Sequence, residues 1–231
     1  MSRTASASIV HQYSLGDEIA SSITHGIGAL LSIIGLVVLV AFAATYGQAR
    51  AIASCAVFGS TLVLLYTAST VYHTTSSVQY PSPSPRIEPW LRRLDHIAIY
   101  FLIAGTYTPF TLIALSGAWG WSLFGLVWTL AFIGSAMELG FLHEARLLAS
   151  LLYIAMGWVG LIAIGPLVKH VPIGGLVLLF SGGLAYTLGV PFYLSRRIPY
   201  SHTIWHLFVM AGSVLHYLAV LLYVLPNVPH A

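Results

Sequence analysis

Long apolar runs dominate the pattern of hydrophobic and polar positions along this chain. Seven of them come close to the roughly 20 residues that a helix needs to cross a bilayer. They cover residues 22–46, 51–73, 95–116, 119–137, 149–168, 173–193 and 203–225. Each run is continuously apolar rather than alternating, and backbone groups in lipid must satisfy one another, so helices are favoured over tilted barrel strands. The pattern predicts an all-α integral membrane protein, a seven-transmembrane-helix bundle.

Composition leads to the same class. Of the 231 residues, 58% are hydrophobic and only 6% are charged, and the mean hydropathy is +0.88. A soluble globular domain has roughly 25% charged residues. A chain of this size cannot hide so much apolar surface in a core of its own, so lipid must be its main solvent. A secreted, water-soluble pore former is disfavoured for the same reason.

We expect one domain between two short ends. Residues 1–21 form a polar N-terminal segment, residues 22–225 the transmembrane domain, and residues 226–231 a C-terminal tail. The first apolar run is too long for the apolar region of a signal peptide and is predicted to stay in the mature protein. The connection at 74–94 contains the series Pro81, Pro83 and Pro85 and three arginines, and it is predicted to be polar and extended.

The distribution of basic residues predicts the orientation. On one side lie seven Lys and Arg, namely Arg3, Arg86, Arg92, Arg93, Arg146, Arg196 and Arg197, while the other side has only Arg50 and Lys169. This positive-inside bias places the N-terminus in the cytoplasm and the C-terminus outside, in the cell's inner (plasma) membrane. The basic residues are scattered rather than massed, so no nucleic-acid partner is expected.

Ionisable side chains cluster at one predicted membrane depth. The second run ends at His73, with Ser69 one helical turn earlier, and the third begins at Asp95. The seventh run begins with His202 and His206. All five residues fall at the cytoplasmic ends of their helices. Ionisable groups in membrane spans are costly and indicate function by default, so this convergence predicts a site.

Two histidines at i and i+4 share one helical face, which suits a tetrahedral zinc ion, and His73 can supply a third nitrogen. Three protein ligands with an open fourth position are typical of catalytic rather than structural zinc. Such a zinc lowers the pKa of bound water to about 7 and polarises a carbonyl. Asp95 is then a candidate to orient or deprotonate that water, and Ser69 to hydrogen-bond the water or the oxyanion.

Simpler interpretations exist for these residues. Interfacial histidines often hydrogen-bond only headgroups or backbone, and a lone His-x-x-x-His pair is a weak signal. Asp95 is also suited to cap a helix N-terminus and pair with Arg92 or Arg93.

Four other ionisable residues are left out of the predicted site. His25 can line the same cavity or simply pack beside small residues. His216 lies ten residues beyond His206, about 15 Å deeper, and cannot share that metal. Glu138 and Glu144 are expected at the surface near the fourth connection.

Five short motifs, taken together and in order, resemble the bacterial hemolysin III family. They are SSITHGIG at 21–28, STVYH at 69–73, LDHIAIY at 94–100, AGTYTP at 104–109 and HTIWH at 202–206. The resemblance spans nearly the whole chain. That family belongs to the wider progestin and adipoQ receptor group, which is itself grouped with the alkaline ceramidases.

The resemblance implies a seven-helix fold with a cytosol-facing zinc bound by His73, His202 and His206. The family's aspartate and serine positions match Asp95 and Ser69. In the related receptors and ceramidases the site is linked to hydrolysis of a lipid amide, which implies membrane lipids as partners. Bacterial members are also linked to membrane-lipid homeostasis, and the family name records cytolysis.

Two functional hypotheses follow. The first is a zinc-dependent hydrolase acting on an amide or ester bond of a lipid. The second is a cytolytic or pore-forming, transport or receptor-like signalling protein whose zinc is structural or sensory. An open three-histidine set beside Ser69 and Asp95 favours the first, because a structural zinc normally has four protein ligands.

Overall fold

The fold is a bundle of membrane-spanning helices. The computed structural model describes residues 13–115, 117–140, 145–195 and 197–228. Within these ranges, seven helical segments are long and apolar enough to cross a membrane, which confirms the predicted class. They are α1 (Leu15–Ala44), α2 (Ala49–Val78), α3 (Glu88–Pro109) with η1 (Phe110–Leu115), α4 (Gly117–Gly140), α5 (Arg146–Trp158) with η3 (Val159–Ala163) and α6 (Ile164–His170), α7 (Ile173–Leu194), and α8 (Ser201–Ala219) with η4 (Val220–Val224) and η5 (Leu225–Asn227).

Several helices extend beyond their apolar runs. α1 begins at Leu15 rather than at 22, because the Ser14 side chain accepts a hydrogen bond from the Asp17 amide at 3.1 Å and caps the helix. Two acidic residues in the first turn, Asp17 and Glu18, also suit the positive end of the helix dipole. α1 therefore carries two carboxylates into the bundle that the apolar pattern had left outside.

The second connection is shorter than the predicted 74–94 loop. α2 continues to Val78, and α3 begins at Glu88, so residues 79–87 join them. Pro89 stands in the first turn of α3, where a missing amide proton costs nothing. The polar residues before Asp95 are therefore helical, because a helix end outside the apolar layer does not need an apolar sequence.

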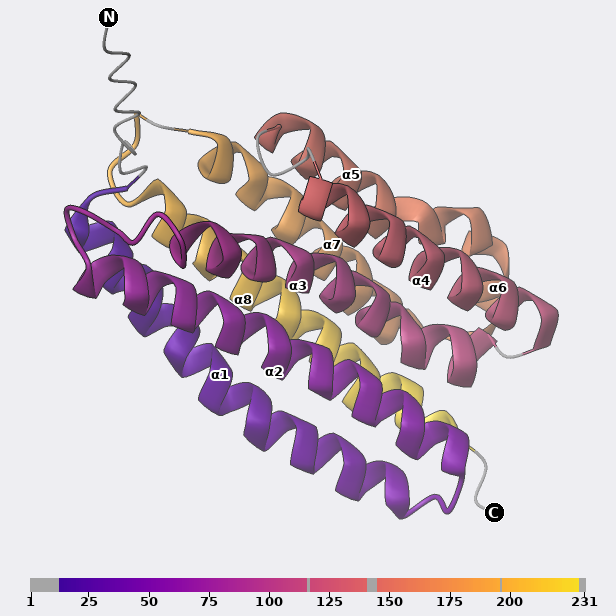
Figure 1. Cartoon of the computed structure of the whole chain (residues 1–231). Coiled ribbons are helices and arrows are strands. Elements are labelled where there is room, and N and C mark those ends of the chain that lie inside the picture. The colour runs from indigo at the N-terminus through magenta and orange to yellow at the C-terminus, as the bar shows by residue number, and fades with distance from the viewer. Residues whose placement is uncertain (1–12, 116, 141–144, 196, 229–231) are drawn as a thin grey trace, which may run out of the picture.

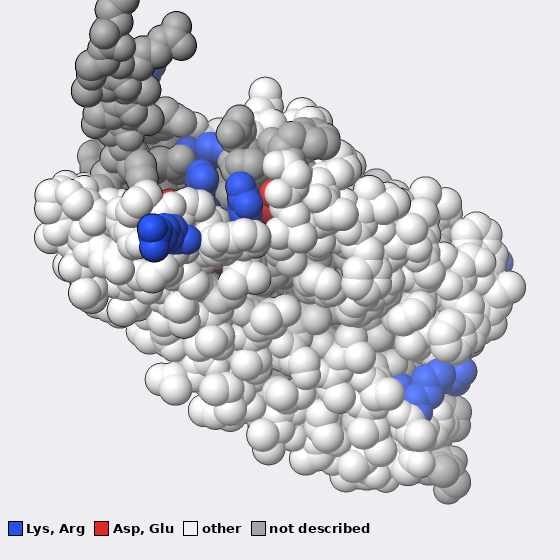
Figure 2. All heavy atoms as spheres, viewed as in Figure 1, with Lys and Arg blue, Asp and Glu red and all other residues white. Residues whose placement is uncertain are grey.

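The helices pack around one another in a closed arrangement (Figure 1). α1 packs between α2 and α8, α3 contacts α2 and α4, and α7 lies against α8 and α5. The start of α1 and the end of α8 lie at opposite ends of the bundle (Figure 1). On the face shown in Figure 2, Lys and Arg gather at those two ends and leave an uncharged belt between them. The belt matches the hydrocarbon layer of a bilayer.

Close helix contacts at glycine hold the site-bearing helices together. A Cβ on Gly28 of α1 would lie 2.6 Å from the Tyr66 ring of α2, closer than real atoms approach. Tyr66 in turn meets His25 edge-on, with ring centroids 5.0 Å apart. The small residue thus lets α1 and α2 approach closely. The polar cluster lies at one end of this helix pair.

Candidate metal centre

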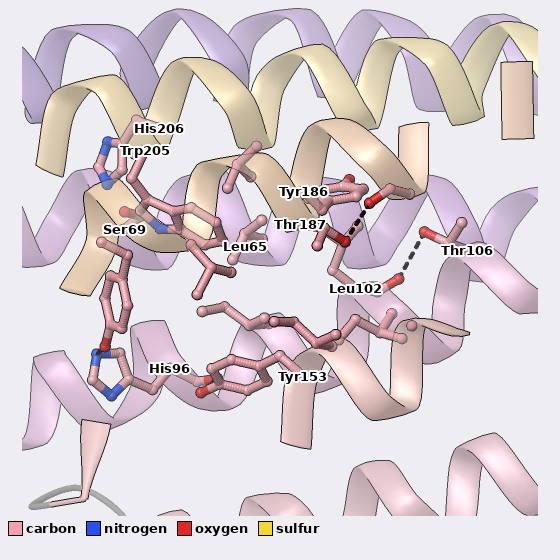
Figure 3. Close-up of a pocket in the computed structure, with 18 of the residues that line it drawn as sticks. Leu65, Ser69, His96, Leu102, Thr106, Tyr153, Tyr186, Thr187, Trp205 and His206 are labelled. Carbon is pink, nitrogen blue, oxygen red and sulfur yellow. Dashed lines mark hydrogen bonds between the residues drawn. The ribbon is translucent and has the colours of Figure 1, made fainter. Parts of the chain in front are cut away.

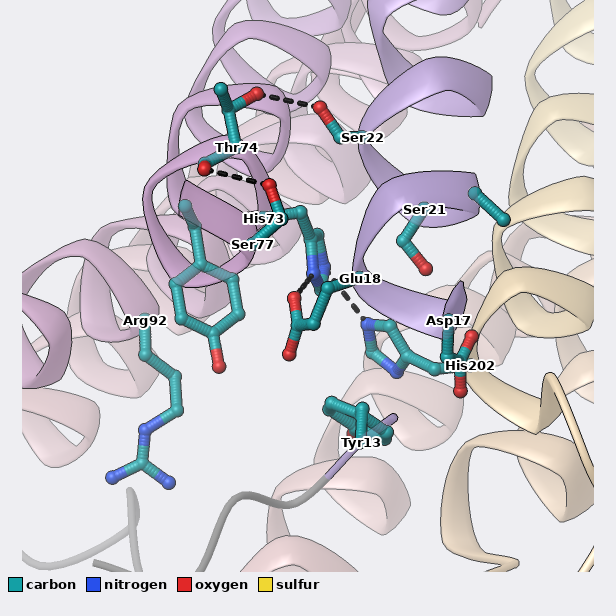
Figure 4. Close-up of polar contacts among 12 residues, drawn as sticks. Tyr13, Asp17, Glu18, Ser21, Ser22, His73, Thr74, Ser77, Arg92 and His202 are labelled. Carbon is teal, nitrogen blue, oxygen red and sulfur yellow. Dashed lines mark hydrogen bonds and ion pairs between the residues drawn. The ribbon is translucent and has the colours of Figure 1, made fainter. Parts of the chain in front are cut away.

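Three buried histidines meet near the N-terminal ends of α1 and α8. His73 comes from α2, and His202 and His206 come from α8, one turn apart. One nitrogen of each ring lies within 4.8 Å of the other two. The Nε2 atoms of His73 and His202 face each other at 3.1 Å (Figure 4). The structure therefore brings together the three residues that the sequence predicted as metal ligands.

α1 fixes the start of α8, which carries two of these histidines. The Oδ1 atom of Asp17 accepts hydrogen bonds from the Thr203 amide at 3.0 Å and from the Thr203 hydroxyl at 2.6 Å. The carboxylate thereby satisfies an amide in the first turn of α8, where helices lack internal acceptors. Because Thr203 lies next to His202, this contact sets the position of that ring.

A second carboxylate of α1 holds His73. The Nδ1 atom of His73 donates a hydrogen bond to Glu18 Oε2 at 2.7 Å, and both side chains are buried (Figure 4). A proton on Nδ1 leaves the lone pair of Nε2 directed at His202. Metal-ligating histidines nearly always have such a partner on the other ring nitrogen. Glu18 was not among the predicted site residues, because it precedes the apolar run at 22–46.

His206 is oriented by backbone and by stacking. Its Nδ1 atom lies 3.3 Å from the Ser21 carbonyl, which leaves Nε2 free. The ring stacks on His25 with centroids 3.4 Å apart and planes 8° apart. His25 is buried and lines the cavity described below, so both of its predicted roles, packing and lining, are present.

The donor set fits a metal ion. Two imidazole nitrogens 3.1 Å apart are near the ~3.3 Å expected between ligands of a tetrahedral zinc with bonds of about 2.0–2.1 Å. A carboxylate behind one ring and a carbonyl behind another are the supports that such sites use. Imidazole also suits copper, iron and nickel, so the geometry supports a metal site without choosing the metal.

Ser69 and Asp95 lie at the same cavity as His202 and His206. Both are buried, and the Ser69 hydroxyl lies close to the Asp95 carboxyl. Asp95 stands about two turns inside α3 rather than at its N-cap, so the capping alternative is wrong. Arg92 instead pairs with Glu88 at 3.8 Å.

The cavity runs from this cluster into the apolar middle of the bundle. It measures about 100 Å³, with Ser69, His96 and His206 at one end and Tyr186, Thr187 and Thr106 towards the other (Figure 3). A second cavity of about 70 Å³ shares Thr106 and His216 with the first. His216 donates from Nε2 to the Leu179 carbonyl at 2.9 Å and lies apart from the three-histidine cluster, as the sequence predicted. Together the two cavities form an apolar space with a polar end.

One expectation for the acidic residues was wrong. Glu138 is fully buried and accepts a hydrogen bond from His96 Nδ1 at 2.8 Å, rather than lying at the surface. α4 continues to Gly140, which places Glu138 inside its last turn, facing α3. Glu144 lies outside the described residues. The signal for Glu138 was present, since a carboxylate in a membrane-spanning helix needs a buried partner.

Tyr13 covers the site from the N-terminal side (Figure 4). Its ring lies 4.3 Å from the His202 ring, and its hydroxyl accepts a hydrogen bond from Arg146 Nη2 at 2.9 Å. Burial raises the pKa of the Tyr13 phenol, so the residue stays neutral. The segment before α1 therefore helps to separate the histidines from water.

A helical protein whose described residues form seven membrane-type spans, with three clustered buried histidines and an internal cavity lined by two of them, an aspartate and a serine, is a multi-pass membrane protein with an enclosed polar site. A family model described as haemolysin-III related matches residues 13–217. The chain therefore belongs to the haemolysin-III related family, and the resemblance found in the sequence motifs is confirmed.

Individual relatives agree with this family assignment. Hemolysin-3 of Bacillus cereus is 44% identical over 211 residues, which are 91% of this chain and 93% of the relative. A hemolysin-3 homolog of Bacillus subtilis (strain 168) is 43% identical over 91% of this chain and 96% of its own length. The monocyte to macrophage differentiation factor of Homo sapiens is 30% identical over 71% of this chain and 67% of the relative. This last match supports the link to the progestin and adipoQ receptor group.

Proposed function

We propose that this protein is a zinc-dependent hydrolase embedded in the plasma membrane, which cleaves an amide or ester bond of a lipid. The observation that carries the proposal is a set of three buried histidines, with no fourth protein ligand grouped among the described residues, beside Asp95 and Ser69. An open coordination set next to a carboxylate and a hydroxyl is typical of catalytic metal sites.

The roles of the protein groups follow from their chemistry. When bound, zinc supplies a Lewis acid that polarises the scissile carbonyl and makes water more acidic. Asp95 accepts a proton from the attacking water. Ser69 donates a hydrogen bond to the carbonyl oxygen as negative charge develops on it. Glu18 keeps the Nε2 lone pair of His73 directed at the centre of the cluster.

The apolar cavity supports a lipid substrate. Its inner part is lined mainly by aliphatic and aromatic side chains, such as Leu65, Leu102 and Trp205 (Figure 3). Burial of an acyl chain against such a surface contributes roughly 0.8 kcal/mol per CH₂ group. The scissile bond would then lie at the polar end. We place that end at the cytoplasmic face, on the basis of the positive-inside bias, and infer a role in membrane-lipid homeostasis.

The experiment that tests the proposal is a turnover assay on purified, zinc-loaded protein with a panel of lipid amides and esters. The wild type is expected to release free fatty acid from at least one of them. Asp95→Asn is expected to retain zinc and to lose turnover by at least about 10²-fold. A wild-type protein that holds zinc and cleaves no member of the panel would contradict the proposal.

Cytolysis is the second candidate, and the name of the Bacillus cereus relative, hemolysin-3, favours it. In this case the zinc would be structural or sensory, and the protein would act as a pore, transporter or receptor. Dye release from liposomes containing the purified protein distinguishes the two functions. Release that needs zinc but survives Asp95→Asn would support cytolysis, because a pore needs no proton acceptor.

A further inference from the structure

A second buried ion pair lies beside the three-histidine cluster. His96 of α3 donates from Nδ1 to Glu138 Oε1 of α4 at 2.8 Å. The Glu138 side chain has no exposed surface, and the His96 side chain keeps 11% of its own. A carboxylate taken out of water costs several kcal/mol unless its partner and hydrogen bonds compensate. Such a pair inside a membrane span therefore indicates a role in function.

The two nitrogens of His96 have different surroundings. Nδ1 is held by the carboxylate, whereas the hydrogen-bond partner of Nε2 among the described residues is the Tyr193 hydroxyl, at the longer distance of 3.4 Å. The backbone of His96 is fixed as well, since its carbonyl accepts a hydrogen bond from Tyr153 at 3.2 Å. If the His96–Glu138 pair served helix packing alone, the ring would not need one nitrogen held by a short hydrogen bond and the other held only weakly at the cavity.

His96 lines the same cavity as Asp95, Ser69 and His206 (Figure 3). An imidazole whose Nδ1 proton is bound by a buried carboxylate has its Nε2 atom free for proton transfer, and the carboxylate stabilises the imidazolium form. The Glu138–His96 arrangement places such a nitrogen at the wall of the cavity. Neither residue is one of the three clustered histidines or their direct partners.

We propose that His96 is the general acid of this cavity, positioned by Glu138, and that the bond cleaved has a basic leaving group, the amine of a lipid amide. This inference rests on the proposed hydrolase function. The oxygen of water bonds to the carbonyl carbon while Asp95 takes one of its protons. The carbon–nitrogen bond then breaks, and the nitrogen keeps the electron pair and takes the Nε2 proton of the His96 imidazolium, which leaves a neutral ring with its proton on Nδ1 beside Glu138.

The products are a fatty acid and an amine, with one water consumed. The proton on Asp95 leaves to solvent, and solvent returns one to His96, which restores both groups. Asp95 accepts one proton and His96 donates the other. This division explains why the cavity has a second acid–base group in addition to Asp95. An amine is expelled only after its nitrogen gains a proton, whereas a nitrophenolate leaves without one.

The test compares two substrates with the same acyl chain, an N-alkyl amide and a p-nitrophenyl ester, on zinc-loaded full-length protein in lipid–detergent micelles. His96→Gln is expected to lower kcat for the amide by about 10²- to 10⁴-fold with little change in KM. Its turnover of the nitrophenyl ester is expected to stay within about threefold of the wild type, because that leaving group needs no acid catalyst. Glu138→Gln is expected to show the same selectivity with a smaller loss.

The matched control is His170→Gln, since His170 lies at the end of α6, outside the cavity. It is expected to leave both rates unchanged. Equal losses of both substrates in His96→Gln and in Glu138→Gln, with zinc content retained, would overturn the general-acid role and leave the proposed hydrolase intact. Cleavage of neither substrate by the zinc-loaded wild type would overturn both proposals together.

A spectroscopic readout needs no turnover. In protein labelled with ¹⁵N-histidine, the signal that is missing from His96→Gln belongs to His96. At the pH of the turnover assay it is expected to report protons on both ring nitrogens, with the Nδ1 proton held by the 2.8 Å bond to Glu138, and to shift in Glu138→Gln. A neutral ring with its proton on Nε2 would overturn positioning by Glu138, even if the variants fold poorly.

Discussion

Glu18 Oε2 accepts a hydrogen bond from His73 Nδ1 at 2.7 Å, and this bond joins the first turn of α1 to the last turns of α2. Both side chains are buried, so water cannot replace either partner. The bond decides which nitrogen of His73 is free to bind a metal. The affinity of the site should therefore depend on a residue that is not itself one of the clustered histidines.

Glu18→Gln is expected to weaken zinc binding by about 10- to 100-fold, the usual effect of losing a carboxylate behind a ligating histidine. The amide of Gln can still accept the hydrogen bond but lacks the charge that makes the imidazole a stronger ligand. Competition with a chelator of known affinity measures the change. Glu88→Gln is the matched control, because Glu88 pairs with Arg92 outside the cluster. Equal affinity in wild type and Glu18→Gln would rule out the supporting role.

Replacement of the clustered histidines should remove the metal itself. His73→Ala, His202→Ala and His206→Ala are each expected to lower zinc content from about one ion per chain to a small fraction, because two imidazoles bind far more weakly than three. Elemental analysis of purified protein gives the ratio. His170→Ala should hold as much zinc as the wild type, since that side chain hydrogen-bonds the Pro166 carbonyl away from the cluster. Full zinc content in any of the three cluster variants would exclude that residue as a ligand.

The sequence alone was sufficient to predict the membrane-spanning helices and the residues that the fold brings together in the central cluster. Continuous apolar runs determine membrane spans directly, and His73, Asp95 and His202 stand out because polar residues are rare in such runs. Glu18 was missed because it precedes the apolar run at 22–46, although the helix begins earlier, at Leu15. A local cap at Ser14 decides that start, and apolar patterning does not report it.

The contact between His96 and Glu138 could not be predicted from the sequence, for a different reason. The two residues are 42 positions apart on different helices, and their contact depends on how α3 and α4 rotate against each other. Hydropathy specifies that a helix spans the membrane but not which neighbour its polar residue faces. The rule that buried carboxylates need partners identifies Glu138 as unusual without naming His96.

Asp17 should matter for stability as well as for the site. Asp17→Ala removes the acceptor of these two hydrogen bonds from Thr203 and leaves a partly buried amide in the first turn of α8 without this partner. The expected loss is about 1–3 kcal/mol in unfolding free energy, with reduced zinc content because His202 is adjacent. Thermal unfolding in detergent and elemental analysis measure the two effects. Thr203→Ser keeps both donors and should behave like the wild type. If Asp17→Ala has the same stability and zinc content as Thr203→Ser, α1 does not position α8.

Gly28 tests whether close approach of α1 and α2 is needed for the site. Gly28→Ala puts a methyl group where the Tyr66 ring lies, 2.6 Å from the added carbon, and this ring packs edge-on against His25. Overpacking of this kind costs about 1–3 kcal/mol and should push α1 from α2, which lengthens the Glu18–His73 bond and lowers zinc affinity. Gly125→Ala in α4 meets nothing within 4 Å and is the matched control. The unfolding temperature, and the zinc affinity measured by chelator competition, should both fall in Gly28→Ala and stay unchanged in Gly125→Ala. Loss of stability with zinc affinity unchanged would show that the contact supports the bundle but not the metal centre.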